Sequence, residues 1–222
     1  MPTSGVVMAE IWRFDGRLLH PCPETDEAAY LRPVASIIYY DFTSAEAFAL
    51  SEVAASIDPA PQIEWRGVEI EPGLPTPMPV LDRRSQERLE VDAPNDVWRS
   101  EAFGIVMPKG RANTRRALTA VAAVARMHAT RADAFRVALF RAYWRDGEDL
   151  SLRPVIQFIA DHAGVPRWVD LEDPGAAASL IGWELDWRTE RLGGVPRAIR
   201  ADGQILWSVK DEASAREFLL GN

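Results

Sequence analysis

The chain has 222 residues, of which 47% are hydrophobic, enough for a packed core and too many for a disordered protein. Its 25 lysines and arginines against 33 aspartates and glutamates give a net charge of −8, which argues against general binding to the phosphate backbone of nucleic acids. The one cysteine, Cys22, excludes an internal disulfide, a Cys-x-x-Cys redox pair and a cysteine-rich zinc site within these residues.

The first residues predict a β-hairpin, because two apolar-rich runs, residues 6–14 and 17–20, flank an Asp-Gly pair. Residues 1–7 lack the basic segment and apolar run of a secretory signal, and no stretch approaches the ~18 uninterrupted apolar residues of a membrane span. We therefore expect a cytoplasmic protein that binds neither nucleic acid nor membrane. A free Cys22 fits a reducing compartment.

A strand–helix–strand unit is expected next. Residues 34–42 (VASIIYYDF) are β-branched and aromatic and apolar on both faces, which is typical of a central buried strand. Apolar residues at near-helical spacing over 45–54 predict a helix that Pro59 and Pro61 end, and the partial alternation of residues 62–71 predicts a second strand. Such a unit suits a parallel strand pair with a crossover helix.

The middle of the chain is predicted to be helical. Residues 72–79 hold four prolines and predict a loop that is poor in backbone donors. Helical spacing of apolar residues then predicts helices over 113–145, with a break near Thr130, over 151–163 and over 174–192.

The last residues return to a strand pattern. Residues 196–200 and 204–209 flank the turn Ala201-Asp202-Gly203, and residues 211–220 predict a final helix with Asp211 as a candidate N-cap. The two α/β halves form one sheet if the helical block between them is an insertion. We therefore expect an N-terminal hairpin, a first α/β half, a helical insertion and a second α/β half, over residues 1–32, 33–106, 107–176 and 177–222.

This order resembles a thioredoxin fold with an inserted helical domain. Residues 40–48 (YDFTSAEAF) look like the first strand and helix start of the DsbA family, which includes FrnE-type proteins, 2-hydroxychromene-2-carboxylate isomerases and kappa-class glutathione transferases. The resemblance covers roughly residues 34–220 and leaves the hairpin outside. It implies an α/β, thioredoxin-like fold of the DsbA type with an extra N-terminal β-hairpin. Four further segments resemble the family: residues 64–72 (EWRGVEIEP), 113–118 (NTRRAL), 138–143 (ALFRAY) and 193–196 (GGVP).

The resemblance places a candidate site at the start of the first helix. Redox members of the family carry Cys-x-x-Cys there, whereas this chain has Ser44-Ala45-Glu46-Ala47, so we do not expect dithiol–disulfide exchange. The isomerase and kappa branches place a serine at the first position, where its hydroxyl holds the thiolate of glutathione. Ser44 matches that serine, although the family usually continues with proline and an aromatic residue.

The same residues also fit a purely structural role. Thr43-x-x-Glu46 has the pattern of a capping box, with Thr43 as N-cap and Glu46 as the third helical residue. The Glu46 carboxylate at the positive end of the helix dipole would repel a bound thiolate by up to about 4 kcal/mol at ~4 Å, before screening. Ser44 and Glu46 are therefore candidate catalytic residues, with helix capping as the alternative.

The ligand side of the site is also implied by the resemblance. It implies a cis peptide bond before Pro196, with the backbone of Val195 offered to an extended thiol peptide or to glutathione. Thr43 and Asp211 are the other candidate ligand-binding residues. Family members often have an aspartate after the last strand that contacts the ligand's amino end; here Lys210 holds that position, or Asp211 does with a shift of one residue, which weakens the match to glutathione recognition. Three arginines either supply charge for a ligand carboxylate or form a solvated helix face: Arg111, Arg115 and Arg116.

Two functional hypotheses follow. The first is a family member that has lost the redox dithiol and binds a peptide or a small thiol-conjugated ligand between Ser44 and Val195-Pro196. The alternative is a glutathione-dependent isomerase or transferase in which Ser44 positions the glutathione thiolate. Glutathione is the candidate cofactor, no metal is expected, and the N-terminal hairpin is a candidate contact for a homodimer.

Overall fold

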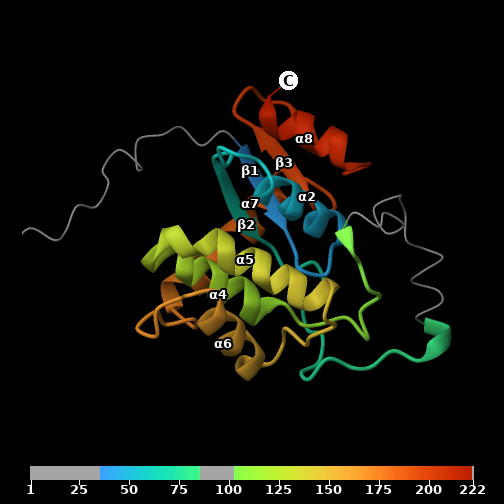
Figure 1. Ribbon diagram of the computed structural model, residues 1–222, viewed down its shortest axis with the longest axis vertical. Helices are drawn as coiled ribbons and strands as arrows, with labels where there is room; N and C mark the ends of the chain where they lie inside the picture. Colours follow the sequence, from blue (N-terminus) through green and yellow to red (C-terminus); the bar gives the residue numbers. More distant parts are fainter. Residues whose placement is uncertain (1–35, 86–102, 222) are drawn as a thin grey trace, which may run out of the picture. The chain divides into compact units, whose positions relative to one another are not determined.

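The structure is a computed structural model that describes residues 36–85 and 103–221 (Figure 1). The predicted N-terminal hairpin and Cys22 lie outside the described residues. Within the described ranges, no helix is long and apolar enough to cross a membrane.

One four-stranded sheet forms the centre of the fold, in the order β2-β1-β3-β4. Strands β1 (Ser36–Tyr40) and β2 (Ile63–Gly67) are parallel, and the first residues of the two strands are partners. Strand β3 (Arg197–Arg200) runs antiparallel to β1 and pairs with the short β4 (Ile205–Leu206) across the predicted turn. The predicted parallel pair, β1 and β2, and the predicted hairpin near the C-terminus, β3 and β4, are therefore confirmed.

The helices follow the predicted order. Helix α2 (Ala45–Ala55) crosses over between β1 and β2, and α8 (Glu212–Leu220) ends the fold beside α2. The described residues between β2 and β3 include the helices α4 (Arg115–Met127), α5 (Ala129–Trp144), α6 (Arg153–His162) and α7 (Pro174–Thr189) (Figure 1). The predicted break near Thr130 falls at His128, whose ψ of 65° is outside the helical range.

Side chains alternate between the two faces of the sheet along each strand, and both faces are covered by other parts of the chain. On one face, β1 contributes Ile38 and Tyr40 to the main core, which also holds residues of α2, α5 and α8. On the other face, Tyr39 packs with Val68 and Leu192, beside tryptophans of α7. A sheet covered on both faces explains why residues 34–42 are apolar without alternation.

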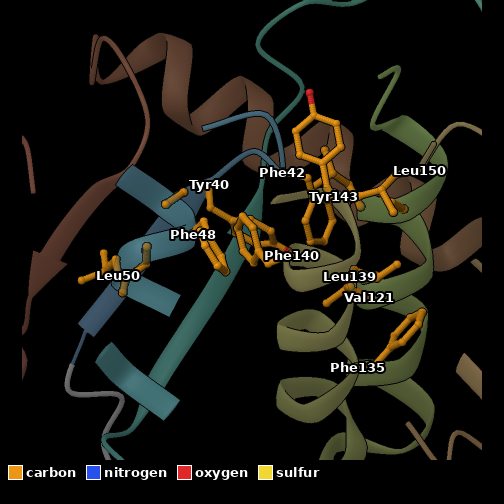
Figure 2. Packing of buried hydrophobic residues seen from close by; sticks show 14 of the residues in the cluster. Tyr40, Phe42, Phe48, Leu50, Val121, Phe135, Leu139, Phe140, Tyr143 and Leu150 are labelled. Carbon is orange, nitrogen blue, oxygen red and sulfur yellow. The ribbon is translucent and has the colours of Figure 1, made fainter. Parts of the chain in front are cut away.

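An aromatic cluster fixes the start of α2. Phe42, between β1 and α2, lies 4.7 Å from Phe140 of α5 between ring centroids, and both rings are fully buried (Figure 2). The indole of Trp144 donates a hydrogen bond of 2.9 Å to the Phe42 carbonyl. Packing of this kind contributes beyond apolar burial alone, and it holds the two residues that follow Phe42 in a defined position.

Candidate functional site

Ser44 is the N-cap of α2 and also contacts the loop before β3. Its hydroxyl accepts a hydrogen bond of 3.2 Å from the Ala47 N–H and donates one of 3.0 Å to the Val195 carbonyl. The predicted capping box, with Thr43 as N-cap and Glu46 as third residue, is therefore wrong. The Thr43 hydroxyl instead donates to the Asp41 carboxylate at 2.9 Å, so the cap is one residue later.

Asp41 explains this shift of the cap. Its carboxylate is 1% exposed and accepts four hydrogen bonds: two from Thr43, one from the Ile70 N–H at 3.0 Å and one from the Thr114 hydroxyl at 3.1 Å. Burial raises the pKa of Asp41, and these hydrogen bonds oppose that rise. Asp41 therefore connects the end of β1 to the segment after β2 and to the start of α4. Through its bonds to Thr43 it also fixes the backbone just before Ser44.

Glu46 accepts a hydrogen bond from Val209, and not from the backbone of the N-cap residue as the predicted capping box required. It lies in the first turn of α2, and its carboxylate accepts a hydrogen bond of 2.8 Å from the Val209 N–H. This bond fixes the segment after β4 beside the amino end of α2. The negative charge lies at the positive end of the helix dipole, as the sequence predicted.

The loop before β3 completes the site. The peptide bond between Val195 and Pro196 is cis, and Pro196 is buried. The bond between Ser44 and the Val195 carbonyl joins residues 151 positions apart. No acceptor for the Val195 N–H is found in the part of the chain that the structure describes. The structure thus brings Ser44, Val195 and Pro196 together and leaves a backbone donor beside them.

Asp211 has a structural role in the described fold. It caps α8 by accepting a hydrogen bond of 2.7 Å from the Ser214 N–H, as its predicted N-cap role requires. Hydrogen bonding from Ser214 lowers the pKa of this exposed carboxylate. Asp211 follows Val209, the partner of Glu46, by two residues, so a contact with a ligand at Ser44 stays a prediction.

Arg197 and Trp207 belong to the same region, and Arg197 was not predicted from the sequence. The buried Arg197 guanidinium donates to the Leu192 carbonyl at 2.6 Å and to the Trp207 carbonyl at 2.7 Å, and its central carbon lies 4.0 Å from the centroid of the Trp207 ring. Burial lowers the pKa of Arg197, and Glu46 opposes this. Trp207 remains 60% exposed. The one signal in the sequence that could have indicated this site is the charged residue Arg197 within the predicted strand of residues 196–200.

The arginines at the start of α4 are all in ion pairs. Arg111 pairs with Glu71, Arg116 with Glu172 at 3.2 Å, and Arg115 with Glu184 at 2.6 Å and Glu69 at 3.9 Å. Their positive charge is therefore matched by carboxylates of the chain itself. Among the described residues, no group of histidine, cysteine, aspartate and glutamate side chains could hold a metal ion.

Comparison with known proteins identifies the fold. No family model matches the chain, and no curated protein matches it in sequence. Solved structures do match. A probable DsbA oxidoreductase from Streptomyces coelicolor has a TM-score of 0.66 at 16% identity, with 84% of this chain and 88% of the other covered. A 2-hydroxychromene-2-carboxylate isomerase has a TM-score of 0.60 at 17% identity, with 84% and 92% covered.

A third match is the cytosolic disulfide reductase DsbM from Pseudomonas aeruginosa, solved with GSH. Its TM-score is 0.60 at 14% identity, and the match covers 84% of this chain and 97% of that one. Likeness at this level of identity establishes the fold. The chain therefore has the DsbA-like thioredoxin fold, with helices inserted between its two strand-containing halves, as the sequence predicted.

Proposed function

We propose that this protein binds a peptide or a small thiol-conjugated ligand at the Ser44–Val195 site without redox chemistry. The observation that carries the proposal is the backbone of Val195, which is held by the Ser44 hydroxyl while its own N–H has no acceptor among the described residues. An extended ligand recognised by main-chain hydrogen bonds can use such a donor. The exposed ring of Trp207 offers an apolar surface nearby.

Absence of the dithiol supports the non-redox part of the proposal. Exchange needs a thiolate that attacks a disulfide sulfur, and positions 44 and 47 hold serine and alanine. The chain's one cysteine, Cys22, is distant in sequence from this helix start. We include a cytoplasmic location in the proposal, and the similarity to a cytosolic disulfide reductase supports it.

Glutathione-dependent isomerase or transferase chemistry is the second candidate, and the similarity to a 2-hydroxychromene-2-carboxylate isomerase favours it. In that role Ser44 would donate its hydroxyl proton to a thiolate. A serine hydroxyl has one proton, and here the Val195 carbonyl receives it. The Glu46 carboxylate adds a negative charge at the same helix end. Both observations support the binding function more than the enzymatic one.

Calorimetry with two probes separates the candidates. S-methylglutathione has no thiol and cannot form a thiolate, so a binder accepts it about as well as reduced glutathione. An enzyme that holds the thiolate binds reduced glutathione more tightly, and loses that preference in Ser44→Ala but not in the control Ser56→Ala, at the C-cap of the same helix. The proposal is wrong if neither probe binds at millimolar concentration, or if the purified protein catalyses the reduction of insulin disulfides.

A further inference from the structure

A second site lies at the other end of the sheet from Ser44. An open cavity of about 660 Å³ is bordered by the end of α2, the beginning of β2 and one side of α5. Ile63 in its wall pairs with Ser36, the first residue of β1, whereas Ser44 follows the last residue of that strand. Most of the wall is apolar and built from small side chains, among them Ala54, Ala55, Pro61, Val137 and Ala138.

One residue of the cavity wall carries a buried cation. Arg136 of α5 is 2% exposed, and its guanidinium carbon lies 3.6 Å from the centroid of the Trp65 ring, which also lines the cavity. The guanidinium donates to the Ser51 hydroxyl at 2.5 Å and to the Asp133 carboxylate at 3.1 Å. Its Nε–H is buried and has no acceptor among the described residues. A buried charged donor without an acceptor is costly, so a ligand that supplies one gains binding energy.

The ion-paired group that includes the charged residues of the cavity wall has a positive excess. Glu52 accepts hydrogen bonds from Arg141 at 2.8 and 3.0 Å and from Arg145 at 2.9 Å. The charged residues in the cavity wall are Arg136, Arg141 and Asp133, and together with Glu52 and Arg145 they form a group of three arginines and two carboxylates. The Asp133 side chain is 74% exposed, and solvent weakens its effect on the buried Arg136. An anion in the cavity would balance this excess.

We propose that the cavity binds a small organic monocarboxylate, with its carboxylate on Arg136 and its apolar body against the small-residue wall. Arginine is suited to this role because its planar group presents several donors to a carboxylate, and stacking on Trp65 fixes its orientation. The volume is within the range of about 300–1,000 Å³ that is typical of small-molecule sites. An inorganic anion would leave the apolar wall unused. The proposal is independent of the function assigned to the Ser44–Val195 site.

Calorimetry with octanoate and octanamide tests the proposal, because the two probes share a chain and differ in charge. We expect saturable binding of octanoate and at least ten-fold weaker binding of octanamide. Arg136→Met removes the cation, and Ala138→Phe fills the cavity while leaving the cation in place. Each variant should lose octanoate binding, whereas Ala129→Phe, on the exposed face of the same helix, and Ser44→Ala should retain it.

Several results would overturn the proposal. Equal affinity for octanoate and octanamide would exclude the role of Arg136, and unchanged octanoate binding in Ala138→Phe would place the ligand elsewhere. Absence of octanoate binding at millimolar concentration would exclude the site as proposed. If circular dichroism shows that Arg136→Met does not fold, Ala138→Phe and the octanamide comparison decide the question alone.

Discussion

Replacing Ser44 with alanine should destabilise the fold more than loss of an ordinary helix cap. The Ser44 hydroxyl makes two bonds at once: it accepts from the Ala47 N–H at 3.2 Å and donates to the Val195 carbonyl at 3.0 Å. The first bond caps α2, and the second joins the helix to the loop before β3. Alanine removes both and leaves each backbone partner without its protein contact.

The two losses can be estimated separately. An N-cap serine is worth about 1 kcal/mol against alanine. A hydrogen bond between a side chain and the backbone contributes about 1 kcal/mol to net stability. We therefore expect Ser44→Ala to lower the free energy of unfolding by about 2 kcal/mol. For a chain of this length, that corresponds to a fall in melting temperature of about 6 °C.

Urea unfolding followed by circular dichroism measures this difference. Asp211→Ala is the matched control, because Asp211 caps α8 through the Ser214 N–H and its side chain makes no long-range bond that the structure describes. It should cost about 1 kcal/mol. Ser44→Thr keeps the hydroxyl and should stay close to the natural chain. Equal losses in Ser44→Ala and Asp211→Ala would refute the contribution of the Val195 contact.

Three further predictions concern Glu46, Arg197 and Glu69. Glu46→Gln keeps an acceptor for Val209 but removes the charge, so S-methylglutathione should bind several-fold more tightly by calorimetry; weaker binding would mean that the carboxylate contacts the ligand. Arg197→Lys cannot keep both carbonyl contacts and the stacking, so urea unfolding should show a loss of about 2 kcal/mol, and no loss would contradict this. Burial raises the pKa of Glu69 above its ordinary 4.5, with Arg115 opposing. A raised pKa means that this carboxyl favours folding at low pH and that its contribution is lost as pH rises. As the pH rises above 4.5, the free energy of unfolding of the natural chain should therefore fall relative to that of Glu69→Gln. Parallel curves of the free energy of unfolding against pH for the two proteins would refute the raised pKa of Glu69.

Most of the fold could be predicted because local patterns and the order of elements agree. The apolar run of residues 34–42, the helix after it and the turn at residues 201–203 each carry a local signal, and their order leaves few sheet topologies. The last strand was predicted to be longer than β4. Its limit is a tertiary effect, because the Trp207 carbonyl accepts a hydrogen bond from the Arg197 side chain.

Details of the site depended on contacts between distant residues. Thr43 and Ser44 are both good N-cap residues, and the choice between them is made by Asp41, whose burial depends on Ile70 and Thr114. No local pattern reports those partners. Arg136 illustrates the same limit. Its position among apolar residues of α5 is visible in the sequence, but its stacking on Trp65 follows from how the helix packs against β2.

The central claim is that a peptide or a small thiol-conjugated ligand binds at the Ser44–Val195 site without redox chemistry, so a probe whose thiol is blocked should bind there. The most direct measurement is a titration of the isotope-labelled protein with S-methylglutathione, followed by amide and indole NMR signals. We predict saturable changes that are largest for the Val195 and Ser44 amides and for the Trp207 indole, and small changes around Arg136. Absence of changes at Val195 at saturating probe concentration, or changes centred elsewhere in the chain, would contradict the claim.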